Sequence, residues 1–99
     1  MTSQNSPLTR PLADPEAVVA ELLTFLEEQT RSLWEPETDL YRDGGLSSLF
    51  AMQLVVHLEK SYGIAIRGAD LRLDNFRTVR LMSALVGRLQ QAQADGRDG

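Results

Sequence analysis

Two adjacent serines, Ser47 and Ser48, follow a glycine pair and precede a long apolar pattern with helical spacing. A serine hydroxyl in such a place could act as a nucleophile, or it could cap the exposed N–H groups at the start of a helix. A Ser–His–acid hydrolase uses a Gly-x-Ser-x-Gly elbow between a strand and a helix. Leu49 stands where the second glycine belongs, and no alternating strand and helix pattern surrounds it. Residue type alone therefore favours a helix cap.

Few other residues have side chains that could act in catalysis or bind a metal. The chain has no cysteine and one histidine, His57, which excludes disulfides, thiolate-bound zinc, a cysteine nucleophile and imidazole-rich metal sites. We interpret His57 as a surface or half-buried helix residue without a catalytic role. Asp39 and Asp43 are not accompanied by further oxygen ligands at calcium-loop spacing, so we interpret them as loop and cap residues. The sequence predicts no catalytic residue and no metal site.

Size and charge narrow the function classes further. Ninety-nine residues suffice for one small domain. Ten Lys and Arg against fourteen Asp and Glu give a net charge of −4, which argues against nucleic-acid binding and against an anionic membrane surface. No apolar run approaches the roughly 18 to 20 residues of a membrane span, and the polar start lacks the layout of a signal peptide. We expect a cytoplasmic monomer that binds neither nucleic acid nor membrane.

The chain divides into three predicted parts. Residues 1–13 are rich in Ser, Thr, Asn and Pro without an apolar period, which is typical of a flexible leader. Residues 14–90 form the folded domain, and residues 91–99 form a second flexible tail. No repeat or low-complexity block interrupts the domain.

Within the domain, apolar spacing predicts three long helices and a short one. The long helices start near Asp14, Ser47 and Arg77, and they end near residues 30–32, 62 and 90. A short helical turn is expected within residues 68–73, and residues 64–66 are expected to be a loop that fills the core. These elements make an all-α fold, a four-helix bundle if the short helix is counted.

The surface expectations follow from the same pattern. We expect Glu21, Glu27 and Glu28 to face water, and we expect the long loop after the first helix to be anchored by its apolar residues, Leu33, Trp34, Leu40 and Tyr41. The second predicted helix carries more apolar residues than one buried stripe needs. It must therefore be buried on several sides or present an apolar edge to a partner.

The set of motifs resembles the acyl carrier protein family, whose modification site reads Gly-x-Asp-Ser-Leu at the start of the second helix. The resemblance runs from about Val18 to Leu89. It rests on Gly45-Leu46-Ser47-Ser48-Leu49, the preceding Asp39-Leu40 approach, Glu59-x-x-Tyr62-Gly63-Ile64 and Asp74-Asn75-Phe76-Arg77-Thr78-Val79. It implies a bundle of three long helices plus one short helix.

By this resemblance, Ser48 receives 4′-phosphopantetheine from coenzyme A in a reaction run by a separate Mg²⁺-dependent transferase. Ser47 is the rival acceptor, but the family's serine directly precedes the leucine, and only Ser48 does so here. Ser47 replaces the usual acidic residue, and Phe50, Gln53 and His57 occupy places where the family often has acidic residues. We expect the partner interface to include the residues around the attachment site, namely Ser47, Leu49, Phe50, Gln53 and His57.

Residues 48–55 and 74–79 look most like small discrete carrier proteins of polyketide clusters, which serve antibiotic biosynthesis. Those carriers hold a glyceryl group that is oxidised and methylated into hydroxymalonyl or methoxymalonyl extender units. The resemblance implies a carrier without catalytic activity of its own. It implies as partners a phosphopantetheinyl transferase, an acyl-loading enzyme, a tailoring dehydrogenase and methyltransferase, and a polyketide synthase acyltransferase.

Two alternatives remain open at this point. The chain could be a peptidyl or aminoacyl carrier, or it could be a helical interaction module that uses the apolar face of the second helix. In the second case Ser48 would only be a helix cap. Within the carrier hypothesis, a short polar cargo gains little by entering the core, so we expect weak burial of the cargo.

Overall fold

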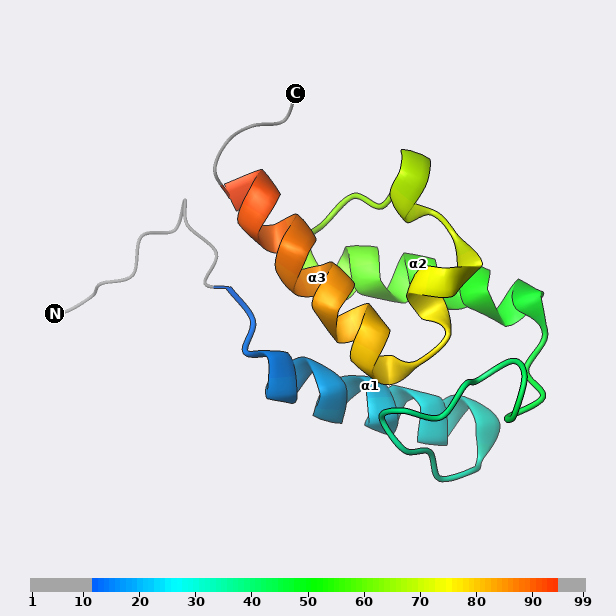
Figure 1. Ribbon diagram of the computed structural model, residues 1–99. Helices are drawn as coiled ribbons and strands as arrows, with labels where there is room; N and C mark the ends of the chain where they lie inside the picture. The colour runs from blue at the N-terminus through cyan, green and yellow to red at the C-terminus, as the bar shows by residue number, and fades with distance from the viewer. Residues whose placement is uncertain (1–11, 95–99) are drawn as a thin grey trace, which may run out of the picture.

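The computed structural model describes residues 12–94, and these residues form an all-helical fold (Figure 1). Its elements are α1 (Pro15–Thr30), α2 (Ser48–Tyr62), the 3₁₀ turns η1 (Gly68–Asp70) and η2 (Leu73–Phe76), and α3 (Val79–Ala94). The predicted all-α class is confirmed. No helix among these residues is long and apolar enough to cross a membrane. Most of the predicted leader and the end of the predicted tail lie outside the described residues.

The expected short helical turn within residues 68–73 is present as the 3₁₀ turn η1, and a second 3₁₀ turn, η2, follows it. Neither is an α-helix, so the described residues form three α-helices, and the description as a four-helix bundle is wrong. Leu71 interrupts the helical path, because its backbone angles of φ −86° and ψ 68° lie outside the α region. The loop at residues 64–66 behaves as predicted, since Ile64 and Ile66 are both buried in the core.

Helix ends follow local capping chemistry at two of the predicted boundaries. Asp14 accepts a hydrogen bond from the N–H of Ala17 at 3.1 Å, and Pro15 takes the first helical position. Gly63 ends α2 in the left-handed conformation, with φ 65°. α3 continues to Ala94, four residues past the expected end, because residues 91–94 are Gln and Ala, which favour helix and bring no breaker.

The core lies where α3 packs on both α1 and α2 (Figure 1). Each helix contributes fully buried leucines or other large apolar side chains. Its largest members are Phe76, Leu22, Leu26, Leu40, Leu54, Leu58, Met82 and Leu85. Burial of this apolar surface is the main favourable term that holds the helices together.

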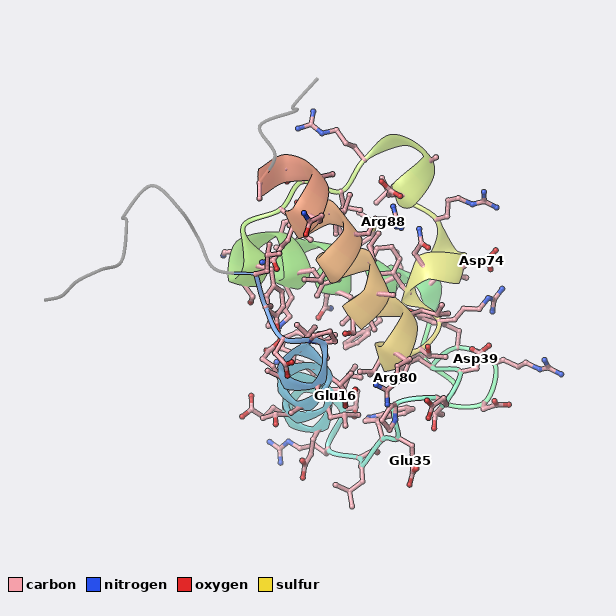
Figure 2. All side chains as sticks on the ribbon, turned by 60° about the vertical axis from the view of Figure 1, so that its left-hand side comes forward. Glu16, Glu35, Asp39, Asp74, Arg80 and Arg88 are labelled. Atoms are coloured by element: carbon pink, nitrogen blue, oxygen red, sulfur yellow. The ribbon has the colours of Figure 1, made fainter. Side chains whose placement is uncertain are left out.

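The long loop between α1 and α2 is fastened to the start of α3. Leu40 donates its N–H to the carbonyl of Arg77 at 2.8 Å, and Arg80 donates its N–H to the carbonyl of Pro36 at 3.0 Å. The guanidinium of Arg80 also contacts Glu37 in the loop at 3.3 Å, and it joins α3 to α1 through Glu16 at 2.7 Å (Figure 2). These contacts fix the loop that leads into α2.

One expected loop anchor, Leu33, is wrong, because its side chain is 82% exposed. Arg31, directly after α1, adopts the left-handed conformation with φ 62°, and the chain that leaves this turn presents Leu33 to solvent. Trp34 anchors the loop as predicted, and its indole N–H donates to the Thr30 hydroxyl at 2.8 Å. The fully buried Leu40 and the half-buried Tyr41 match the prediction.

Candidate functional site

Ser48 is the first residue of α2, and it is exposed. Ser47 holds the cap position with extended backbone angles, yet its hydroxyl makes no capping hydrogen bond. The N–H of Phe50, which a capping hydroxyl would bind, donates to the carbonyl of Ser47 at 3.0 Å instead. Neither serine hydroxyl therefore caps α2, although residue type alone favours a cap at this pair.

The first turn of α2 has unused hydrogen-bond donors. Within residues 12–94, the N–H groups of Ser48 and Leu49 have no acceptor, and the first turn contains no acidic side chain. Free N–H groups and the positive end of the helix dipole favour a negatively charged group there. A phosphodiester on a side chain of this turn would fit these donors.

Two glycines, Gly44 and Gly45, shape the loop that precedes α2. Gly45 has a φ of +76°, a conformation that side chains with a Cβ rarely adopt. Gly44 lies under the Trp34 ring, because a Cβ at Gly44 would be 2.6 Å from Cη2 of Trp34 and 2.7 Å from the carbonyl oxygen of Leu40. The carbonyl of Leu40 also accepts the N–H of Leu46 at 3.0 Å. The loop is therefore packed closely at Gly44, whereas Gly45 is exposed with open space around it.

Asp39 organises the first part of this loop, as predicted for a loop residue. Its carboxylate accepts from the N–H groups of Arg42 at 2.9 Å and Tyr41 at 3.1 Å, and Arg77 approaches it at 3.4 Å. The hydrogen bond from the Arg42 N–H is the largest cause that lowers the pKa of Asp39. The other carboxylate considered, Asp43, is exposed, and its N–H donates to the carbonyl of Asp39 at 3.0 Å.

A small crevice opens beside Ser48, between α2 and the 3₁₀ turns. Its volume is about 180 Å³, and most of its lining atoms are apolar. The lining residues are Ser48, Ala51, Met52, Val55, Leu71, Arg72, Leu73 and Phe76. Ser48 thus lines a small, mostly apolar crevice.

Helix α2 presents an apolar edge, one of the two alternatives that its composition left open. Leu49, Met52 and Val56 are 77%, 53% and 51% exposed, respectively. Sequence reasoning named Leu49 as an interface residue but missed Met52 and Val56. Their spacing of three and seven residues from Leu49 is the signal that could have found them.

The other predicted interface residues differ in their solvent exposure. Ser47 and Gln53 are exposed, whereas Phe50 is half-buried and packs against the core. The ring of His57 stacks on Phe25 with centroids 3.8 Å apart, and the His57 side chain is only 17% exposed.

The prediction that Glu21 faces water is wrong. Its carboxylate accepts from the Tyr62 hydroxyl at 2.7 Å and contacts Nε2 of His57 at 2.8 Å. The side chain therefore joins α1 to α2 and does not face water alone, whereas Glu27 and Glu28 are exposed as expected. Burial and the contact with Glu21 raise the pKa of Tyr62 above its usual value.

Comparison with known families identifies the family to which the chain belongs. The model of the family described as "phosphopantetheine attachment site" matches residues 16–86, from the first turn of α1 to the middle of α3. The chain belongs to the phosphopantetheine attachment family. Comparisons with curated proteins and with solved structures give no match.

Members of the phosphopantetheine attachment family carry a covalently attached 4′-phosphopantetheine group. They are carrier domains that generally lack catalysis of their own and interact with phosphopantetheinyl transferases and acyl-handling enzymes. The group supplies a flexible arm that ends in a thiol, on which cargo is held as a thioester. The free N–H groups at the start of α2 fit its phosphate end.

Proposed function

We propose that Ser48 is the attachment residue of the phosphopantetheine arm. The observation that carries this proposal is the place of Ser48, exposed at the first turn of α2 beside N–H groups without acceptors. A phosphodiester at that turn gains from the helix dipole, a contribution of about 0.3 to 1 kcal/mol at an exposed site. Ser47 is the weaker candidate, because it lies outside the helix and does not directly precede Leu49.

The proposed protein is a discrete acyl carrier of secondary metabolism, with its carrier domain over residues 14–94. We propose a glyceryl-derived cargo, processed to a hydroxymalonyl or methoxymalonyl extender unit for polyketide synthesis. The likeness of residues 48–55 and 74–79 to such carriers supports this cargo. The small crevice beside Ser48, of about 180 Å³, also supports a short cargo. A long acyl chain is stabilised by about 0.8 kcal/mol for each CH₂ group that it buries, and so small a crevice has room for few of them.

The proposed partners meet the carrier around the start of α2. They are a phosphopantetheinyl transferase, an acyl-loading enzyme, a tailoring dehydrogenase and methyltransferase, and a polyketide synthase acyltransferase. The interface residues in this proposal are Ser47, Leu49, Phe50, Gln53 and His57. Exposure of Ser47, Leu49 and Gln53 supports this assignment, and Phe50 and His57 would contribute their uncovered edges.

Mass spectrometry of the intact protein tests the attachment residue. The protein is incubated with coenzyme A, Mg²⁺ and a broad-specificity phosphopantetheinyl transferase. We expect an increase equal to one phosphopantetheine group in the wild type and in Ser47→Ala, and none in Ser48→Ala. Loading that survives Ser48→Ala would refute the assignment. Absence of loading in the wild type would favour an interaction module that uses the apolar edge of α2.

Analysis of the thioester carried in the producing cell tests the cargo. The loaded arm is released from the purified carrier and its mass is measured. We expect a three-carbon glyceryl group or the hydroxymalonyl or methoxymalonyl unit made from it. An aminoacyl group would assign the chain to the peptidyl carriers instead.

A further inference from the structure

Lys60 is the single lysine of a chain that carries nine arginines and no cysteine. The difference between the two cations matters near a thioester. An uncharged lysine amine is a nucleophile, whereas the arginine guanidinium keeps its charge and its protons in proteins. Lys60 is therefore the one side chain with an amine that could take an acyl group from a thioester.

Lys60 lines a groove that borders the crevice of Ser48. The groove has a volume of about 620 Å³, and its lining from α2 includes Met52, Val56 and Lys60. Met52 also lines the crevice beside Ser48, so the two hollows share this residue. Met52, Val56 and Lys60 follow one another at intervals of four residues, which places them along one side of α2. The two hollows together thus border α2 from Ser48 to Lys60.

The separation of Ser48 and Lys60 matches the reach of a phosphopantetheine arm. Lys60 follows Ser48 by twelve positions in α2, about 18 Å along the helix at 1.5 Å per residue. The arm has about fourteen bonds from the serine oxygen to the sulfur, and an extended chain gains about 1.2 Å per bond, which gives about 17 Å. The lysine amine stands on a flexible four-carbon stem, which makes up the remaining distance.

The Lys60 side chain is not held in place by a carboxylate. Lys60 is exposed, and it makes no ion pair within residues 12–94. The carboxylate of Glu59, its neighbour in sequence, accepts the N–H of Ile66 at 2.8 Å and is thus directed to the loop after α2. Rotation of the Lys60 side chain along the groove therefore breaks no ion pair in the described part of the chain.

We propose that Lys60 is an acylation site that takes acyl groups from the thioester on the chain's own arm. This inference rests on the proposed attachment at Ser48. The uncharged Lys60 amine attacks the thioester carbonyl, a C–N bond forms, the C–S bond breaks, and the amine proton passes to the departing sulfur. The products are an amide on Lys60 and a free thiol, so the step needs no further reactant. Cargo that no partner enzyme collects is thereby lost to Lys60.

Mass spectrometry with a hydroxylamine step tests this transfer. Acetyl-coenzyme A, Mg²⁺ and a broad-specificity phosphopantetheinyl transferase load the protein with an acetylated arm. The sample is then incubated at mildly alkaline pH, where more of a lysine amine is uncharged. Hydroxylamine removes acetyl groups from thioesters and leaves amides intact. We expect a growing fraction that carries the arm and keeps one acetyl group after this treatment, and peptide mapping should locate that group on Lys60.

Two matched variants separate transfer within the chain from acetylation in solution. Lys60→Arg keeps the charge at an exposed position, so it should load like the wild type and retain no acetyl group after hydroxylamine. Ser48→Ala is incubated with about 10 µM acetyl-coenzyme A, and its Lys60 should be acetylated about a hundredfold more slowly than in the loaded wild type, because a short flexible tether supplies an effective concentration of about 1 mM. Dilution of the loaded wild type should leave its rate unchanged.

Other outcomes overturn the inference without touching the carrier function, because the mass of the arm is measured on every sample. A thioester that stays fully sensitive to hydroxylamine, an amide on the N-terminal amine in place of Lys60, or equal retention of acetyl in Lys60→Arg would each overturn it. So would a rate that falls on dilution, or an equal rate in Ser48→Ala. Failure of the wild type to gain the arm would instead overturn the proposed function.

Discussion

The indole ring of Trp34 lies directly against the backbone of Gly44, so that the loop before α2 is closed by a ring that leaves no room for a side chain. Trp34 is held there by its hydrogen bond to the Thr30 hydroxyl at the end of α1. The path of the chain toward Ser48 thus depends on a contact between the end of one helix and the loop that starts the next.

Gly44→Ala is expected to destabilise the protein by about 1 to 3 kcal/mol, because the new methyl group must displace the Trp34 ring or the carbonyl of Leu40. Urea unfolding followed by circular dichroism measures the change. Gly87→Ala is the matched control. Apart from the adjacent residues and backbone of α3 itself, no atom of the described residues lies within 4 Å of a Cβ at Gly87, so this change should stabilise the helix by about 0.5 to 1 kcal/mol. Equal effects of the two changes would contradict the packing argument.

Tyr41→Phe is expected to be neutral or stabilising, by up to about 1 kcal/mol, because the Tyr41 hydroxyl is buried without a hydrogen-bond partner among the described residues. Tyr62→Phe is the control, and it should destabilise by about 1 kcal/mol because it removes the hydrogen bond to Glu21. Urea unfolding at neutral pH compares the two. A clear loss of stability in Tyr41→Phe would show that its hydroxyl has a partner.

Alkaline pH is expected to lower the stability of the fold through ionisation of Tyr41. Burial raises the pKa of Tyr41 to about 12 in the folded protein, above the ordinary value of 10.0. The unfolded chain therefore releases this proton at lower pH, and the stabilisation is present below pH 10 and is lost as pH rises toward 12. Unfolding measured at several pH values from 9 upward should show a shallower decline in Tyr41→Phe than in the wild type.

Acid should weaken the loop through Asp39. The Arg42 N–H, with Tyr41 and Arg77, holds the pKa of Asp39 below its ordinary value. The folded state thus keeps the carboxylate charged at lower pH than the unfolded chain does, so this stabilisation is present above the ordinary pKa and is lost as pH falls through the lowered one. Asp39→Asn should remove that part of the acid dependence. An unchanged slope of stability with pH below 4 would contradict it.

Ser47→Asp is expected to stabilise the apo protein by about 0.5 to 1 kcal/mol, because a carboxylate at the cap position can accept from the free donors of the first turn. If the phosphodiester is attached at Ser48, as proposed, the gain should shrink in the loaded protein, since two negative groups then share these donors. Thermal unfolding of the apo and loaded forms measures the difference. Ser47→Ala is the control, and it should change stability little because the Ser47 hydroxyl makes no cap hydrogen bond.

Features with a local cause could be predicted from the sequence. Asp14 with Pro15 marks the start of α1, and Gly63 marks the end of α2, because capping depends on a few neighbouring residues. The apolar spacing predicts the three long helices for the same reason. The family resemblance, which depends on ordered motifs along the chain, is confirmed by the match over residues 16–86.

Features that depend on distant contacts could not be predicted. Glu21 looks like a solvated helix residue, yet its carboxylate contacts His57 and Tyr62 of α2. These two residues lie 36 and 41 positions further along the chain. Leu33 and Trp34 are adjacent apolar residues, and only the left-handed turn at Arg31 decides which of them faces inward. At the candidate site, the sequence predicts Ser48 but not the exposure of Met52, which depends on how α2 packs.

Gln90 gives the domain a geometry suited to a tether. Its side chain accepts the N–H of Ala13 at 2.8 Å and donates to the carbonyl of Tyr62 at 3.1 Å, so both ends of the domain meet at the last residue of α2. Ser48 is at the first residue of the same helix, about 20 Å away at 1.5 Å per residue. The two ends of the described domain thus lie about one helix length from Ser48, the proposed attachment residue.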